Sequence, residues 1–144
     1  MNRIESVERP RLNCYSMRVE YVETALNLIQ EAAFNGLVSQ WSILPSSLER
    51  IKKEILNTIN LEKSSGTNSF YALSIDQTTM CGFFWIKKGR DTSELHFFSL
   101  TPNIRRMGYG KSALHLALSK IETKYVICRI DKKNKPMLAT ALAE

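Results

Sequence analysis

The chain has 144 residues, a length that fits one domain with a substantial buried core. Hydrophobic residues make up 44% and charged residues 24% of it, which excludes a disordered protein. No apolar stretch approaches the roughly 20 residues of a membrane-spanning helix. The N-terminus lacks the apolar segment of a signal peptide. The net charge of +6 leaves three readings open: an acidic small-molecule ligand, nucleic acid, or solubility alone.

The first part of the chain predicts an N-terminal extension, one strand and two helices. Residues 1–15 are polar and predict an N-terminal extension. Residues 16–21 alternate between apolar and polar side chains, a pattern that predicts a first strand. A helix is expected next, ending near Asn35, because apolar side chains recur on one face at Ala25, Leu26, Ile29, Ala32 and Ala33. A second amphipathic helix is predicted from Pro45, with Leu48, Ile51, Ile55 and Ile59 as its apolar stripe.

The second part predicts a β-rich segment followed by another helix. Residues 70–75 and 80–86 are expected to form a hairpin, and residues 95–100 a third apolar strand. A helix is expected from Gly110, a strand over 125–130 and a short helix over 136–142.

Three cysteines, Cys14, Cys81 and Cys128, are scattered without C-x-x-C spacing. They predict reduced thiols in a cytoplasmic protein, with Cys128 in the core. With only two histidines and no paired cysteines, no metal site is expected.

The segment Arg105-Arg106-Met107-Gly108-Tyr109-Gly110-Lys111 joins the 95–100 strand to the next helix. The first N–H groups of a helix have no intrahelical partner, and the helix dipole is positive there. Gly108 and Gly110 let the backbone approach an anion closely, and the basic side chains add charge. The segment therefore predicts a phosphate site, although an ordinary β-α turn has the same composition. A nucleic-acid ligand is less favoured than a small phosphate-bearing one, because aromatic residues are not interleaved with the basic clusters.

In this context, Arg105-x-x-Gly108-x-Gly110 resembles the Q/R-x-x-G-x-G/A signature of the GNAT superfamily of N-acetyltransferases. The resemblance covers residues 16–144 and implies an α/β (α+β) fold of order β-α-α-β-β-β-α-β-α. Its sheet would be mixed, mostly antiparallel and flanked by helices. It implies acetyl-coenzyme A as co-substrate and a primary amine, of a small molecule or a protein, as acceptor. The implied cofactor-binding residues are Phe98, Leu100, Arg105, Arg106, Met107, Gly108, Tyr109, Gly110, Lys111 and Asn134.

Acetyl transfer to an amine requires a proton acceptor. By its distance from the glycine loop, Glu94 matches the catalytic glutamate of histone-type members of the family. Beside Phe97, Phe98 and Trp85, its proton affinity could be raised by desolvation. His96, on the same strand face, is the rival base. A solvated glutamate and a structural histidine are the alternatives.

Family members usually continue into two further strands and often supply a tyrosine acid there, whereas this sequence ends at Glu144. Two functional classes therefore stay open. One is an N-acetyltransferase. The other is a non-catalytic GNAT-fold protein with a structural or regulatory role in an assembly. An apolar edge at 125–130 predicts a homo-oligomer or another protein partner bound through residues 125–144.

Overall fold

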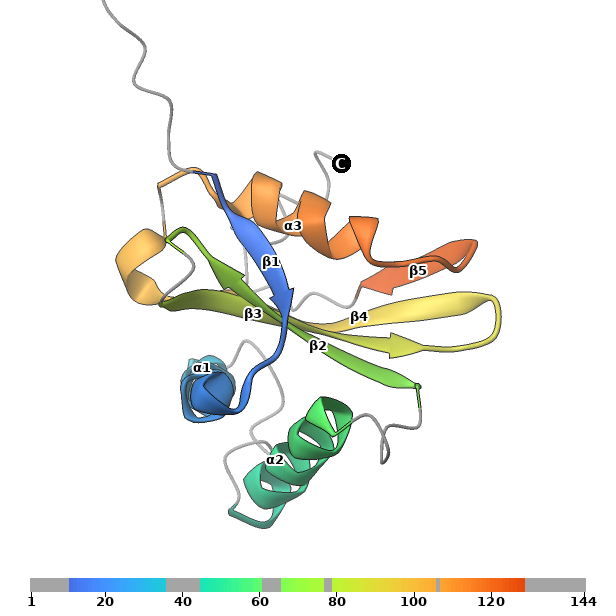
Figure 1. Cartoon of the computed structure of the whole chain (residues 1–144), viewed down its shortest axis with the longest axis horizontal. Coiled ribbons are helices and arrows are strands. Elements are labelled where there is room, and N and C mark those ends of the chain that lie inside the picture. The colour runs from blue at the N-terminus through green and yellow to red at the C-terminus, as the bar shows by residue number, and fades with distance from the viewer. Residues whose placement is uncertain (1–10, 36–44, 61–65, 77–78, 106, 129–144) are drawn as a thin grey trace, which may run out of the picture.

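In the part of the chain that the structure describes, five strands form one sheet in the order of the chain, and three α-helices cover its two faces (Figure 1). The computed structural model describes residues 11–35, 45–60, 66–76, 79–105 and 107–128. The elements are β1 (Asn13–Ser16), η1 (Val19–Tyr21), α1 (Val22–Phe34), α2 (Pro45–Ile59), β2 (Asn68–Ser74), β3 (Met80–Lys88), β4 (Thr92–Leu100), η3 (Pro102–Ile104), α3 (Gly110–Ser119) and β5 (Tyr125–Cys128).

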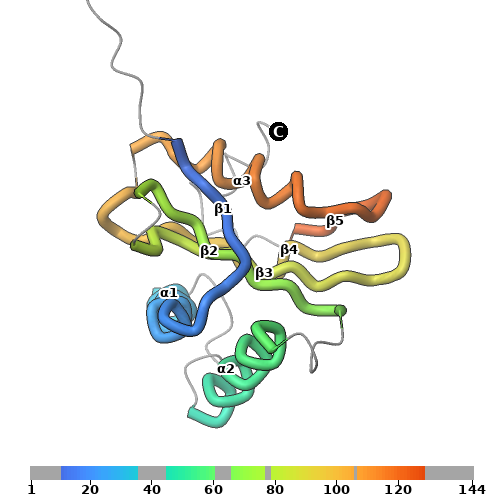
Figure 2. Tube along the Cα trace, in the orientation of Figure 1, coloured from blue at the N-terminus to red at the C-terminus, as the bar shows by residue number. Residues whose placement is uncertain are grey.

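The sheet is antiparallel from β1 to β4, and β5 joins β4 in parallel. A parallel neighbour requires a crossover, and α3 provides it. Figure 2 shows the chain leaving β4, returning along α3 and entering β5 beside the start of β4. The predicted element order is confirmed as far as the fifth strand, and so is the mixed, mostly antiparallel sheet. The predicted helix over 136–142 lies outside the described residues.

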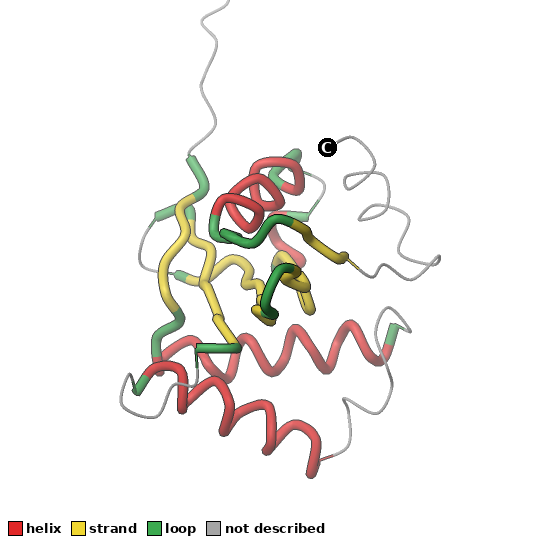
Figure 3. The backbone as a smooth tube through the Cα atoms, turned by 90° about the vertical axis from the view of Figure 1, so that its right-hand side faces the viewer, coloured by secondary structure: helices red, strands yellow, loops and turns green. Residues whose placement is uncertain are grey.

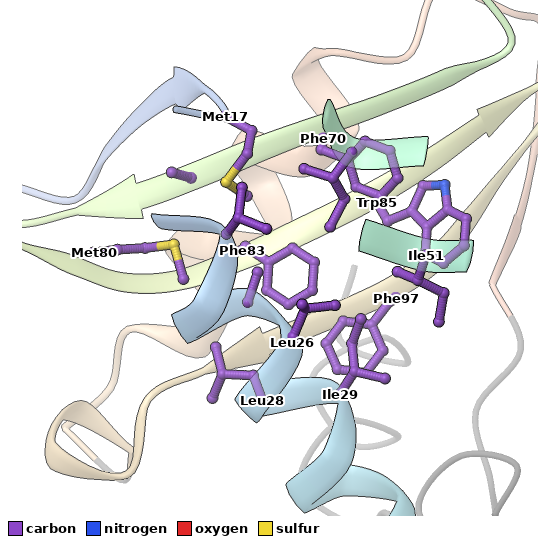
Figure 4. Close-up of a cluster of buried hydrophobic side chains, with 14 of the residues drawn as sticks. Met17, Leu26, Leu28, Ile29, Ile51, Phe70, Met80, Phe83, Trp85 and Phe97 are labelled. Carbon is purple, nitrogen blue, oxygen red and sulfur yellow. The ribbon is translucent and has the colours of Figure 1, made fainter. Parts of the chain in front are cut away.

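Helices α1 and α2 pack side by side against one face of the sheet (Figure 3). The predicted apolar face of α1 is buried, and Ile51 and Ile55 of α2 turn toward the same cluster. In its centre the rings of Phe83 and Phe97 stack at 5.0 Å between centroids. Figure 4 shows this cluster, in which the labelled side chains are Met17, Leu26, Leu28, Ile29, Ile51, Phe70, Met80, Phe83, Trp85 and Phe97.

Helix α3 covers the opposite face with Ala113, Leu114 and Ala117. Strand β3 therefore lies between two cores, and its residues 80–86 are all buried. This double burial explains why the segment is continuously apolar instead of alternating. Phe83 and Phe84 are each fully buried, one in each core. Burial of such a side chain contributes about 1.5–3 kcal/mol.

The first strand differs from the prediction. It spans Asn13–Ser16, whereas residues 16–21 were predicted, and Val19–Tyr21 form a turn of 3-10 helix. Of the side chains in residues 16–21, that of Met17 is buried as expected, whereas Val19 is 63% exposed. Pairing with Tyr71–Ser74 of β2 stabilises the strand although its own sequence is polar. The tertiary contact therefore overrides the local pattern.

The prediction that Cys128 lies in the core was wrong, because its side chain is exposed in β5. All four β5 residues are exposed, and β4 is the described strand that pairs with them. None of the helices in the described part of the chain is long and apolar enough to cross a bilayer.

Candidate functional site

The glycine loop begins where β4 ends and closes onto α3. Thr101 fixes its start, because both its N–H (2.8 Å) and its hydroxyl (3.1 Å) donate to the carbonyl of Cys81. Gly108 has φ of +83°, in the left-handed region that side chains with a Cβ rarely adopt. A glycine is therefore needed there for the chain to turn into α3.

The first turn of α3 presents backbone donors at the end of this loop. Its helical hydrogen bonding begins with Ala113 N–H donating to the carbonyl of Tyr109 at 2.8 Å. The N–H groups of residues 110–112 precede that bond and lie at the positive end of the helix dipole. Lys111 is exposed beside them, and Met107 is 51% exposed. This arrangement can bind an anion such as a pyrophosphate.

Two side chains of the loop contact the rest of the protein, although that of Arg105 is 39% exposed. Tyr109 is buried in the α3-side core. Arg105 donates from Nε to the carbonyl of Leu100 at 2.8 Å, and its Nη2 lies 2.5 Å from Oε1 of Glu31 in α1. The guanidinium thus ties the loop to β4 and α1, so its charge is already paired. The side chain of Arg106 lies outside the described residues.

The backbone of β4 near the loop has groups that point away from β3. Thr101 N–H bonds to β3, and alternate residues of an antiparallel strand point to opposite neighbours. The N–H and C=O groups of Phe98 and Leu100 therefore point away from β3. On that side, the described part of β5 pairs with Thr92–Leu95. A linear ligand could form backbone hydrogen bonds with the N–H groups of Phe98 and Leu100 and the carbonyl of Phe98, since the Leu100 carbonyl accepts from Nε of Arg105.

The two predicted bases meet at an irregularity in β4. Trp85 pairs with Phe97 and Ile86 pairs with Leu95, so His96 is the extra residue of a β-bulge. Nδ1 of His96 lies 3.3 Å from Oε1 of Glu94, close enough for an ion pair when the imidazole is protonated. The side chain of Glu94 is 24% exposed and that of His96 is 36% exposed. The structure therefore brings the two candidates together as a pair.

An aromatic ring fixes the other side of this pair. The imidazole of His96 meets the indole of Trp85 edge-on, with centroids 4.4 Å apart. The indole N–H of Trp85 donates to Oδ1 of Asn68 at 2.9 Å, and Nδ2 of Asn68 donates to Glu54 of α2 at 3.3 Å. Lys87 lies over the indole ring, 5.1 Å from its centroid. These contacts form a polar network between the bulge and α2.

The predicted surroundings of Glu94 are only partly correct. Trp85 and Phe97 lie on its face of the sheet, but Phe98 packs on the α3 side. The bulge is the reason, since one extra residue shifts the alternation of side chains along the strand. Asn134 lies outside the described residues.

Three polar residues of these networks were missed by the sequence prediction: Glu31, Glu54 and Asn68. The two glutamates lie on amphipathic helices, where a charge usually marks the solvated face, so their sequence carried no signal. Within the described part of the chain, no three or more His, Cys, Asp and Glu side chains are arranged to hold a metal ion.

No protein-family model and no curated protein sequence matches this chain. Solved structures do match it. Spermidine N-acetyltransferase from Vibrio cholerae, solved with CoA and spermine, has a TM-score of 0.70 at 11% identity and covers 92% of this chain and 78% of its own. The ribosomal-protein-S18-alanine N-acetyltransferase from Escherichia coli has a TM-score of 0.65 at 13% identity and covers 92% and 76%. The PaiA N-acetyltransferase from Thermoplasma acidophilum, solved with coenzyme A, has a TM-score of 0.57 at 20% identity and covers 76% and 70%.

These three proteins are all N-acetyltransferases, and the two whose names state an acceptor differ in it. At such low identities the likeness is one of fold, and fold alone does not determine an acceptor. The fold predicted from the glycine loop is confirmed.

Proposed function

We propose that this chain, which has the GNAT fold, is an N-acetyltransferase that moves an acetyl group from acetyl-coenzyme A to a primary amine. The observation that carries the proposal is the course of β4, whose last residues lie beyond the described pairing with β5 and lead directly into a glycine loop at the N-terminus of α3. A ligand with a long polar arm and a diphosphate fits this combination. The diphosphate would lie against the backbone donors of α3, and the arm would lie along β4.

The residues present are compatible with such a ligand. Gly108 leaves no side chain at the turn, and Lys111 is exposed where it can meet a phosphate. We assign Arg105 to holding the loop, because its guanidinium contacts Glu31 and Leu100. We keep as proposed cofactor-binding residues Phe98, Leu100, Arg105, Arg106, Met107, Gly108, Tyr109, Gly110, Lys111 and Asn134. Arg105 would contribute through its backbone, because its guanidinium holds the loop.

The reaction we propose is direct attack. The amine nitrogen forms a bond to the thioester carbonyl carbon, and the carbon–sulfur bond breaks. The amine loses a proton to a base of the enzyme, and the coenzyme A thiolate leaves and takes up a proton from solvent. Glu94 and His96 provide the base, because they are the acid–base pair on β4.

The acceptor is a primary amine of a small molecule or of a protein. The structural neighbours include proteins named for spermidine and for an alanine of ribosomal protein S18, so the fold accommodates both classes. The three free cysteines of the described residues are compatible with a reducing compartment, and we place the protein in the cytoplasm.

The test is a transfer assay with acetyl-coenzyme A and three acceptors: spermidine, spermine and a peptide with an N-terminal alanine. We expect release of the coenzyme A thiol together with a mass gain of one acetyl group on an acceptor. Thiol release without acceptor modification would indicate thioester hydrolysis. Tight binding of acetyl-coenzyme A without either product would favour a non-catalytic role.

That second candidate, a non-catalytic GNAT-fold protein in an assembly, is favoured by one observation. Tyr125, Val126 and Ile127 of β5 are 56%, 42% and 45% exposed, and they form an apolar strand at the sheet edge. Such an edge favours pairing with another chain. We propose a homo-oligomer or a protein partner held through residues 125–144, and light scattering of the purified protein would measure its mass.

A further inference from the structure

The bulge in β4 gives His96 a position that an ordinary strand residue would not have. In a regular strand, residues 96 and 97 would point to opposite faces of the sheet. Here Phe97 lies in the core under α1 and α2, and His96 contacts Trp85, a member of the same core. Bulges of this kind re-aim a side chain and are frequent beside active sites.

His96 is also closer than Glu94 to the end of β4 that leads into the glycine loop. The described pairing of β4 with β5 ends at Leu95, just before His96. A strand rises about 3.3 Å per residue, so His96 is about 7 Å from Phe98 along the strand and Glu94 is about 13 Å from it. A thioester carried along β4 from the glycine loop would therefore reach His96 first.

Exposure and contacts separate the two side chains further. His96 is the more exposed of the pair, at 36% against 24% for Glu94. Its ring is held on one side by the carboxylate and on another by the edge-on indole of Trp85. A partly exposed imidazole with contacts on two sides can meet an incoming amine. The carboxylate of Glu94 is the less exposed of the two groups.

From this geometry we propose that His96 is the catalytic base of the transfer and that Glu94 is the positioning residue that orients it. The inference rests on the proposed function. The carboxylate of Glu94, 3.3 Å from Nδ1, favours the tautomer with its proton on Nδ1, whose Nε2 can take a proton. As the amine nitrogen bonds to the carbonyl carbon, its proton passes to Nε2, and the adjacent carboxylate stabilises the imidazolium that forms. The thiolate leaves, and the imidazolium returns its proton to solvent.

Other charged groups contribute to the field around this pair. Lys87 of β3 is paired with Glu94 across the sheet, and Glu54 of α2 connects to Trp85 through Asn68. These two charges have opposite signs and lie on different elements. The carboxylate of Glu94 contacts the imidazole directly, at 3.3 Å from Nδ1.

The experiment compares His96→Gln and Glu94→Gln with the matched control His115→Gln, which changes the exposed histidine of α3. The acceptor is the amine of the three-compound panel that the wild type acetylates fastest. We expect His96→Gln to lower kcat by roughly 10²–10⁴-fold, as for loss of a general base. Glu94→Gln should cost only about tenfold, because an amide oxygen can still accept from Nδ1–H. Added imidazole should restore part of the activity of His96→Ala.

A second measurement tests the geometry without turnover. Because the chain has two histidines, His115→Gln leaves only His96 to be observed by nitrogen NMR of the ring. The Nδ1–H tautomer is expected in that background, with a measurable shift toward the Nε2–H form when Glu94→Gln is added. An Nε2–H tautomer already present with Glu94 intact would overturn the proposal.

The kinetic outcomes are distinct. A 10²-fold loss in Glu94→Gln beside near-normal His96→Gln would overturn the proposal and make Glu94 the base. Normal rates in both variants would also overturn it, while acetyl transfer itself would stand. If the wild type acetylates nothing, the proposed function and the base assignment fail together, whereas the tautomer measurement still decides whether Glu94 orients His96.

Discussion

Arg105 and Glu31 form an ion pair that ties the glycine loop to α1, with Nη2 2.5 Å from Oε1. The same guanidinium donates from Nε to the carbonyl of Leu100 at 2.8 Å. Two segments far apart in the chain, α1 and the end of β4 with its loop, thus meet at one side chain. The first residue of the R-x-x-G-x-G pattern is therefore engaged in holding the protein's own structure.

We expect Arg105→Lys to lower the free energy of unfolding by about 1 kcal/mol, because a lysine cannot make both contacts of the planar guanidinium. The ion pair is about one-third exposed on each side, so its own share of that energy is small. Urea unfolding would measure the change. The control is Glu23→Gln, which removes the more exposed pair with Lys52 and should cost less than about 0.5 kcal/mol. Equal losses in both variants would contradict a special role for Arg105.

Much of the fold could be predicted because its elements follow apolar periodicity. Ala25, Leu26 and Ile29 are spaced at helical intervals and do face the core. The run from Met80 to Ile86 is apolar throughout and forms the strand buried on both faces. The glycine loop was found because a strand and a helix with clear patterns flank it.

What could not be predicted depends on contacts between distant residues. β1 is polar and is stabilised by pairing with β2, which no local pattern reveals. The bulge at His96 inserts one residue into a period-2 pattern, so the sequence predicted Phe98 beside Glu94 when it lies on the other face. Glu31 reaches the glycine loop from α1, about 70 residues earlier in the sequence, and its partner could not be identified from spacing.

Gly108 gives a direct test of the coenzyme A site. Gly108→Ala should raise the Kd for acetyl-coenzyme A about tenfold, because a side chain at φ of +83° strains the loop by roughly 1–2 kcal/mol. Gly108→Glu should raise it further, since a negative charge is added beside the phosphates. Calorimetric titration measures both. Gly66→Ala is the matched control, because Gly66 also has a positive φ of +78° with open space around it. Unchanged affinity in both Gly108 variants would exclude the loop as the site.

Gly82 lies in β3 and pairs with Leu100, the last residue of β4. A Cβ added there would lie 2.6 Å from the carbonyl oxygen of Ser99 and 2.9 Å from Cδ2 of Leu100. Because one of these atoms is backbone, β4 must shift, and we expect Gly82→Ala to cost about 1–3 kcal/mol in thermal unfolding.

A substitution at Gly89 serves as the control that distinguishes a loss of stability from a loss of acetyl-coenzyme A binding. Gly89→Ala would place a Cβ 2.5 Å from the carbonyl oxygen of Thr92, in the turn between β3 and β4. It should also destabilise the protein, but only Gly82→Ala should weaken acetyl-coenzyme A binding. Equal binding in the two variants would show that the backbone of Leu100 contributes nothing to the site.

Cys81 predicts a dependence of stability on alkaline pH. Burial, with a smaller effect of the Asp76 carboxylate, raises the pKa of its thiol from 9.0 to about 11. Between those values the unfolded thiol ionises while the folded one stays neutral, so stability is full below pH 9 and falls toward pH 11. A shift of this size corresponds to about 3 kcal/mol, most of which is lost between pH 9 and pH 11. The difference in unfolding free energy between wild type and Cys81→Ala should therefore change by that order over this range. Two parallel stability curves would contradict it.

The exposed strand β5 allows a test of the proposed interface. If residues 125–144 contact another copy of the chain, Val126→Lys should place a charge in that contact and lower the mass measured by light scattering to that of one chain. A lysine on an edge strand opposes pairing with a second edge. Val19→Lys is the matched control, because Val19 is also an exposed valine, at 63%, but lies in η1. The control should keep the mass of the wild type. A wild type that already has the mass of one chain would exclude a stable homo-oligomer. The partner of β5 would then be a different protein, and the same two variants can be compared for binding to it.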